Sequence, residues 1–255
     1  LRFTQNIPEK DQIGKYYQSE NYISHSDTAK GFINNLYHKV RAKTLINKRE
    51  LVKKYTGKAQ GNILDIGSGT GAFLHTMKTA GWNVTGLEPD ETARQNSEKL
   101  YGINPQDPGA LFTLNKQFDA ITLWHVLEHV HDLHEYMEEL KRLLNPGGKI
   151  FIAVPNYTSY DAGYYQEYWA AYDVPRHLYH FSPSAMKNLF ILHKMKVTHM
   201  KPMWYDSVYV SMLSEQYKTG HSSPLKGGII GSISNIKAAT NSEFCSSIIY
   251  IGDVE

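Results

Sequence analysis

The sequence predicts an α/β protein with a doubly wound, mostly parallel sheet. Short apolar strands alternate with amphipathic helices between about residues 60 and 155. Glycines and prolines separate these segments, as turns between strands and helices require. Because a strand, a crossover helix and a second parallel strand form a right-handed unit, this alternation favours one parallel sheet covered by helices.

The individual segments follow from the spacing of their apolar residues. A helix is expected over 31–57, and the next segments are strand 62–67, helix 71–81, strand 83–89, helix 90–102, strand 118–124, helix 133–144 and strand 149–155. After a long loop come helix 182–194, strand 196–203, helix 205–218 and strand 246–254. Asp90, and either Ser182 or Ser184, are expected to cap helices. The stretch 219–245 is rich in Gly, Ser, Asn and Lys, and the sequence leaves its order open.

Composition excludes several classes of protein. The chain has 255 residues, 41% of them hydrophobic and 20% charged, which suits one α/β domain with additions. The formal net charge of +2 gives no electrostatic case for nucleic acid or an anionic membrane as the main partner. Cys245 is the single cysteine, so the chain forms no internal disulfide, and a cytoplasmic location is expected. No apolar run reaches the ~18 residues of a membrane span. The sequence is compatible with a monomer and with a homodimer.

The stretch 63–71, ILDIGSGTG, places three glycines directly after an apolar strand. Gly67 and Gly69 would let the backbone touch a ligand at the carboxyl end of that strand, and Glu88 at the end of the next strand would accept hydrogen bonds from ribose hydroxyls. Dinucleotides and S-adenosylmethionine both fit this geometry. A tight turn that only packs closely is the structural alternative.

Asp65 distinguishes between the two ligands. Its carboxylate stands just before the glycines, where it would repel a pyrophosphate but suit a ligand that carries an ammonium and a sulfonium. S-adenosylmethionine has both groups and no phosphate. The alternative is that Asp65 only caps the turn through backbone amides.

Four segments together resemble the class I S-adenosylmethionine-dependent methyltransferases: ILDIGSGTGAFL, VTGLEPDE, FDAITLWHVLEHV and LLNPGGKIFIAVPN, over about residues 60–157. The segment DVPRHLYHFSPSAMKNLF is similar to a small-molecule subgroup that includes the ubiquinone-biosynthesis O-methyltransferase type. The resemblance implies a Rossmann-like, seven-stranded sheet with an antiparallel last strand. It also implies S-adenosyl-L-methionine as the cofactor.

The resemblance also implies roles for residues around the cofactor. The methionine part would face Asp65, Gly67, Ser68 and Gly69. Glu88 would hold the ribose, Pro89 and Asp90 would lie beside the adenosine, and Trp124 and His125 would flank the cofactor near the sulfonium. The family often has an acidic residue near the adenine, and Asp107 is a weak candidate for it.

Histidines are the candidate bases. Methyl transfer needs a base only when the acceptor atom carries a proton, as a hydroxyl does. The candidates are His129, His125, His177 and His180, with His129 preferred because it follows the strand at 118–124. The alternative for each is a hydrogen bond within a turn.

His125, Glu128 and His129 form an HxxEH pattern whose side chains would share one face of a helical turn. Such a set can bind a divalent metal. In the ubiquinone-type relatives the comparable place resembles ExxEH and is associated with a divalent cation. Here His125 replaces the first acid, which disfavours magnesium, so no metal is expected. The same pattern also matches an inverted zinc-protease motif, which its position after a strand disfavours.

An aromatic-rich insertion over 157–182 follows the strand at 149–155. We interpret it as the substrate lid, with Tyr165, Trp169, Arg176 and Tyr179 contacting the acceptor. The alternative is the core of a subdomain. The predicted organisation is an N-terminal helical cap or lid over 1–58 and a methyltransferase domain over 59–255, with a cofactor core over 60–157 and C-terminal helices and strands over 183–255. Tyr17, Tyr22 and His25 are candidates for contact with the cofactor.

These observations predict methyl transfer from S-adenosylmethionine to a small-molecule acceptor, with an oxygen acceptor slightly preferred. One alternative is an NAD-dependent oxidoreductase, which Asp65 and the NPGG segment disfavour. The other is a non-catalytic module that only binds the cofactor. A nucleic-acid methyltransferase is disfavoured because the charge is balanced and no base-flipping motif is present.

Overall fold

The computed structural model describes residues 1–9, 12–17, 32–221 and 223–254. Its helices are α1 (Phe32–Thr56), α2 (Ala72–Thr79), α3 (Glu91–Tyr101), α4 (Leu133–Leu143), α5 (Tyr160–Tyr165), α6 (Pro183–Leu192), α7 (Trp204–Thr219) and α8 (Pro224–Thr240). Its strands are β1 (Arg2–Phe3), β2 (Asn62–Ile66), β3 (Asn83–Leu87), β4 (Phe118–Trp124), β5 (Leu144–Pro155), β6 (Tyr179–His180), β7 (Met195–Pro202) and β8 (Ser247–Val254). The side chain of Tyr17, and Tyr22 and His25 as a whole, lie outside the described residues.

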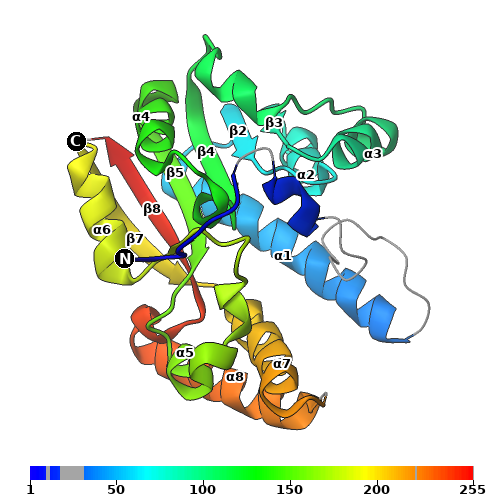
Figure 1. The fold of residues 1–255 in the computed structure, drawn as a ribbon. Coiled ribbons are helices and arrows are strands. Elements are labelled where there is room, and N and C mark those ends of the chain that lie inside the picture. Colours follow the sequence, from blue (N-terminus) through cyan, green and yellow to red (C-terminus); the bar gives the residue numbers. More distant parts are fainter. Residues whose placement is uncertain (10–11, 18–31, 222, 255) are drawn as a thin grey trace.

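The main sheet has the strand order β3-β2-β4-β5-β8-β7 (Figure 1). Strands β3, β2, β4 and β5 are parallel to one another, and β8 is antiparallel to both of its neighbours, β5 and β7. The predicted mostly parallel α/β sheet with an antiparallel last strand is therefore confirmed. The carboxyl ends of β2, β3, β4 and β5 meet at one edge, which is where a doubly wound sheet binds its ligand.

The expected number of strands is wrong: the described residues form six strands in this sheet, not seven. Beyond β3, Gln106 makes only a single parallel bridge to Leu87, with hydrogen bonds to the backbone of Gly86 and Glu88. Pro105 and Pro108 lie close on either side and have no N–H to donate. The segment therefore does not extend into a further strand.

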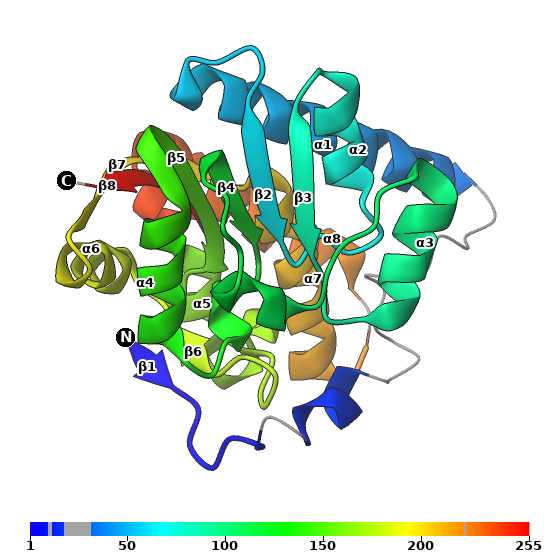
Figure 2. The same ribbon diagram turned by 90° about the horizontal axis from the view of Figure 1, so that it is seen from above.

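Both faces of the sheet are apolar, because side chains alternate along each strand. Ile63 and Ala120 pack with α1 and α2 on one face, whereas Leu64 and Ile121 pack with α4 and α6 on the other. Figure 2 shows α1 and α2 on one side of the sheet and α4 and α6 on the opposite side. This arrangement holds the carboxyl ends of the strands at fixed spacing.

A group of three helices, α5, α7 and α8, lies at one end of the sheet (Figure 1). The stretch whose order the sequence left open, 219–245, contains α8 and a short 3-10 helix (Ser242–Phe244). Gly227 and Gly231 of α8 lie so close to the α7 backbone that a Cβ atom would meet it at 2.6 and 2.5 Å. The glycines thus serve close helix packing.

The N-terminal residues run across the last part of the aromatic insertion. β1 pairs antiparallel with β6, and Thr4 N donates to Leu178 O at 2.9 Å. The predicted boundaries between the cap, the cofactor core, the lid and the C-terminal part stay a prediction. None of the helices in the described part of the chain is long and apolar enough to cross a membrane.

Candidate active site

The glycine loop between β2 and α2 adopts a conformation that requires glycine. Gly67 and Gly69 have φ values of 71° and 55°. The amides of Gly67 and Ser68 both donate to Leu87 O, at 2.8 and 3.0 Å, which ties the loop to the end of β3. A Cβ on Gly67 would meet Val126 Cγ2 at 2.5 Å, whereas a Cβ on Gly69 would meet no atom within 4 Å. The backbone at Gly69 is thus open to a ligand.

Glu88 joins this loop to the next one. Its carboxylate is buried and accepts hydrogen bonds from Gly69 N at 2.7 Å and from Asp90 N at 3.0 Å. Pro89 is exposed beside it, and Asp90 caps α3 as predicted, by accepting from Ala93 N at 2.6 Å. The structure therefore brings Glu88 to the glycine loop, where the sequence predicted a ribose-binding carboxylate.

Asp65 is buried at the carboxyl end of β2 and accepts a hydrogen bond from Thr122 Oγ1 at 2.6 Å. Burial raises the pKa of Asp65 to about 7, against the hydrogen bond from Thr122 and the positive charge of Lys48. A carboxyl that gives up its proton near neutral pH is suited to binding a cationic group. Nearby, the buried Ser68 Oγ has no hydrogen-bond partner among the described residues, so it could bond a ligand.

Lys48 is a site residue that the sequence analysis missed. It reaches from α1 to the ring of Trp124, with Nζ 4.3 Å from the ring centroid. Burial lowers the pKa of Lys48, while the charges of Asp65 and Asp206 raise it. Because Lys48 stands among several basic residues of a helix, nothing in the sequence distinguishes it from its neighbours.

His125, at the end of β4, is clamped between two carboxylates. Its φ of 60° lies in the left-handed region, which is unusual for a residue other than glycine. Nε2 lies 2.9 Å from Asp206 Oδ2 and Nδ1 lies 3.3 Å from Glu128 Oε1. Burial opposes the charged ring, but the hydrogen bonds and charges of Asp206 and Glu128 outweigh it and raise the pKa of His125 to about 10. Asp206, from the first turn of α7, was also missed by the sequence analysis.

His129 and His177 lie side by side, with ring centroids 4.6 Å apart. His129 Nδ1 lies 3.0 Å from Arg176 O, and His177 Nδ1 lies 2.9 Å from Ala171 O. A carbonyl only accepts, so the Nδ1 of each ring carries a proton and donates to it. Burial and the charge of His129 lower the pKa of His177 to about 4.

The described residues that could hold a metal ion are not those the sequence grouped. Glu128, His129 and His177 each offer a ligand atom within 4.8 Å of the others, so His177 replaces His125 in the predicted set. Glu128 is fully buried, and its pKa is lowered because His125, His129 and His177 outweigh the effect of burial. His125 meanwhile contacts Asp206, on the opposite side of its ring from Glu128.

The remaining predicted residues lie in the following places. His180 is buried, and its Nε2 lies 3.2 Å from Thr4 Oγ1, so it faces the N-terminal strand. Arg176 pairs with Asp173 at 2.5 Å. Asp107 caps a short 3-10 helix by accepting from Gly109 N at 2.9 Å.

Of the aromatic residues predicted to contact the acceptor, Tyr165 and Trp169 are buried and Tyr179 is half-buried. Tyr165 and Trp169 form a small core with α7 and α8 residues, and Trp169 Nε1 donates to Asp161 at 2.7 Å. Tyr179 packs against the main core, and its hydroxyl donates to His131 O at 3.2 Å. These positions suit the alternative of a subdomain core, and direct contact of these residues with an acceptor stays a prediction.

A family model described as a methyltransferase domain matches residues 37–195, more than half of the 255-residue chain. The chain belongs to this methyltransferase domain family. The match contains the glycine loop, Glu88 and the histidine cluster formed by His125, His129 and His177. The family resemblance carried by the four sequence segments is thus confirmed.

Curated relatives of this methyltransferase domain are named ubiquinone biosynthesis O-methyltransferase. The relative from Actinobacillus pleuropneumoniae serotype 7 (strain AP76) is 34% identical over 119 residues, which cover 42% of this chain and 50% of the relative. The relative from Pseudomonas aeruginosa (strain UCBPP-PA14) is 28% identical over 127 residues, which cover 41% and 49%. The chain therefore spans about half the length of the curated relatives it matches.

Solved structures share the fold of this methyltransferase domain. The magnesium protoporphyrin IX methyltransferase of Synechocystis PCC 6803, solved with bound SAH, has a TM-score of 0.61 at 13% identity, over 97% of this chain and all of that one. A cyclopropane synthase from Mycobacterium tuberculosis has a TM-score of 0.55 at 15% identity, over 81% and 83%. The predicted Rossmann-like fold is confirmed by these likenesses.

Proposed function

We propose that the chain binds S-adenosylmethionine in the glycine loop and transfers its methyl group to an oxygen of a small-molecule acceptor. The observation that carries this proposal is the pairing of a buried carboxyl, Asp65, with an open glycine backbone at Gly69. A buried carboxylate would repel a pyrophosphate, so this pairing disfavours a dinucleotide. The structural neighbour solved with bound SAH adds support.

Each part of the cofactor has a fitting partner. Asp65 would take the ammonium of the methionine part, and Lys48 its carboxylate. Glu88 would accept from the ribose hydroxyls beside its bonds to the loop. When bound, S-adenosylmethionine supplies a methyl group on a positive sulfur that an acceptor atom can attack in line.

The choice of an oxygen acceptor rests on the histidine cluster and on the names of the curated relatives. A hydroxyl must lose its proton as it attacks, so it needs a base. His125 holds its own proton at neutral pH, because its pKa is about 10, and it therefore cannot serve. His177, with a pKa of about 4, stays neutral but is a weak base.

His129 is therefore the proposed base. Its Nδ1–H is held by Arg176 O, and its Nε2 can accept the proton of the acceptor hydroxyl. His177 packs edge-on against it and fixes the ring. The expected absence of a metal and the expected cytoplasmic location stay predictions. The oligomeric state, monomer or homodimer, also stays a prediction.

The test is transfer of labelled methyl from S-adenosylmethionine to a panel of phenols, catechols and amines. His129→Gln is expected to lower kcat by about 100-fold while the affinity for S-adenosylhomocysteine is unchanged. His75→Gln is the matched control, because His75 stacks on Tyr101, away from the cluster. If the His129→Gln variant kept the wild-type kcat, His129 would not be the base. Loss of activity in EDTA would instead assign a metal to Glu128, His129 and His177.

A further inference from the structure

One face of α8 exposes a row of large apolar side chains. Leu225, Ile229 and Ile236 have 78%, 52% and 70% of their surface exposed. They stand four and seven positions apart, so they share one side of the helix. The opposite side of α8 packs on α7 through Gly227 and Gly231. The exposed row is therefore not part of the protein core.

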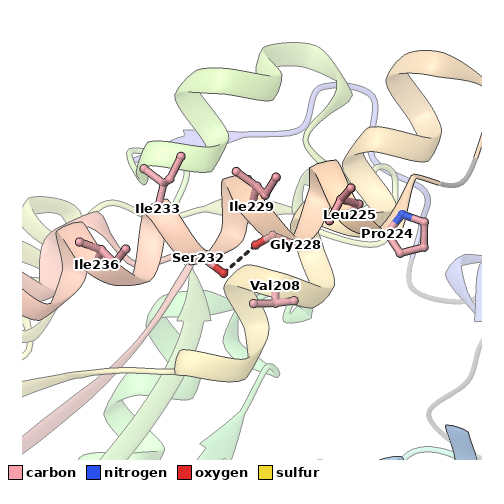
Figure 3. Close-up of a pocket in the computed structure, with 8 residues that line it drawn as sticks. All are labelled: Val208, Pro224, Leu225, Gly228, Ile229, Ser232, Ile233 and Ile236. Atoms are coloured by element: carbon pink, nitrogen blue, oxygen red, sulfur yellow. Dashed lines mark hydrogen bonds between the residues drawn. The ribbon is translucent and has the colours of Figure 1, made fainter.

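A shallow, open groove of about 470 Å³ runs along this face of α8, with Val208 of α7 at its side. Its lining is Val208 from α7 and Pro224, Leu225, Gly228, Ile229, Ser232, Ile233 and Ile236 from α8 (Figure 3). Ser232 is the single polar side chain in this lining, and it already donates to Gly228 O at 2.7 Å. The groove is thus apolar, and none of its lining side chains needs a hydrogen bond from an occupant.

Helix α7, which contributes Val208 to the groove, also exposes aromatic residues. Trp204, Tyr205, Tyr209 and Tyr217 have between 45% and 60% of their surface exposed. Tyrosine and tryptophan combine an apolar ring with a polar tip, which is why they gather at the boundary between a lipid bilayer and water.

The charged residues that α7 and α8 expose at the surface are basic. The acidic residues of α7 are Asp206 and Glu215, and α8 has none. Glu215 is buried and Asp206 contacts His125, so neither faces outward. The lysines Lys218, Lys226 and Lys237 lie at the surface, and Lys226 Nζ pairs with Glu215 Oε1 at 2.8 Å, so the net positive charge comes from Lys218 and Lys237. Although the whole chain is close to neutral at +2, this face is positive.

We propose that the α7–α8 face, defined by Leu225, Ile229 and Ile236 with their flanking lysines, docks on an anionic lipid surface. Apolar side chains that enter the acyl boundary, aromatic residues at headgroup level and lysines that meet anionic headgroups are the chemistry of interfacial helices. A second copy of the chain fits this face less well, because two copies would bring the same positive charges together. The inference does not depend on methyl transfer.

Cosedimentation with vesicles tests the proposal. The full chain is mixed with vesicles of phosphatidylcholine and phosphatidylglycerol, and with vesicles of phosphatidylcholine alone. We expect binding to the anionic vesicles and a loss of about tenfold or more in the variant Leu225→Ser/Ile229→Ser/Ile236→Ser, because apolar burial drives the docking. The matched control is Ile191→Ser/Leu192→Ser on α6, whose side chains are 63% and 66% exposed, and it is expected to bind like the wild type.

A charge variant tests the second half of the proposal. Lys218→Gln/Lys237→Gln, which leaves the Lys226–Glu215 ion pair intact, is expected to weaken binding to anionic vesicles about tenfold or more, since each lysine near an anionic surface contributes to binding. Failure of the wild type to bind anionic vesicles, or equal binding to both kinds of vesicle, would overturn the proposal. So would a wild-type dimer in sedimentation velocity that becomes a monomer in the triple-serine variant, because a second copy would then cover the face.

Discussion

Asp65 is the residue on which the proposed choice of ligand rests. Its carboxylate is surrounded by sheet residues and has one strong hydrogen bond, from Thr122. Burial therefore favours the protonated form and raises its pKa to about 7. A bound ammonium group would reverse this effect by stabilising the charged form, so ligand binding and proton release are coupled.

We predict that the affinity for S-adenosylhomocysteine falls as the pH falls through 7. Below its pKa, the Asp65 carboxyl must release a proton before it can pair with the ammonium, which costs about a factor of ten in affinity for each pH unit. Calorimetric titration at pH 8 and pH 6 should therefore give about tenfold weaker binding at pH 6. Asp65→Asn is the control and should bind equally weakly at both. Equal affinity of the wild type at both values would contradict the role of Asp65.

The sequence could indicate those residues of the candidate site that lie directly after an apolar strand. Gly67, Gly69 and Glu88 are recognisable because each lies at a fixed place after an apolar run, and the structure brings them together. Lys48 and Asp206 are not recognisable in this way. Each enters the site from a distant helix, so only the folded chain reveals its partners.

At the scale of elements, α7 and α8 depend on small residues at their contact. Ser207 and Ser211 of α7 are fully buried, and Gly227 and Gly231 of α8 face them. A composition rich in Gly and Ser is typical of loops, so the sequence left the order of this stretch open. Here the same residues let two helix backbones approach closely, which no apolar periodicity could indicate.

Two glycines of α8 provide a matched pair of variants. A Cβ on Gly231 would meet Ser207 O at 2.5 Å and Val208 Cα at 2.6 Å, whereas a Cβ on Gly228 would meet nothing within 4 Å. Gly231→Ala should lower the free energy of unfolding by about 1–3 kcal/mol through overpacking. Gly228→Ala should raise it by about 0.5–1 kcal/mol, because alanine favours the helix. Urea denaturation measures both, and equal effects would show that α8 does not pack as described.

At the scale of the whole molecule, the alternation of strands and helices was enough to predict a parallel α/β sheet. The apolar runs at β2, β4 and β5 are buried on both faces, which is why they are so clear in the sequence. The strand count was not predictable in this way. It depended on the resemblance to a family, and prolines on either side of Gln106 reduce the outermost strand to a single bridge.

The aromatic insertion shows a second limit of the sequence. Tyr165 and Trp169 suit a substrate wall as well as a subdomain core, because both need large amphipathic side chains. The structure buries them among α5, α7 and α8. Composition cannot distinguish these uses, since only the positions of α7 and α8 decide which side of the insertion is covered.

Calorimetric titration with S-adenosylhomocysteine and with NAD shows whether the glycine loop holds S-adenosylmethionine. We predict that the wild type binds S-adenosylhomocysteine and not NAD. Glu88→Ala should weaken that binding about tenfold or more, through the loss of charged hydrogen bonds. Glu91→Ala, which removes a carboxylate in the exposed first turn of α3, should bind like the wild type. Binding of NAD without S-adenosylhomocysteine would contradict the account and make the protein a candidate dehydrogenase.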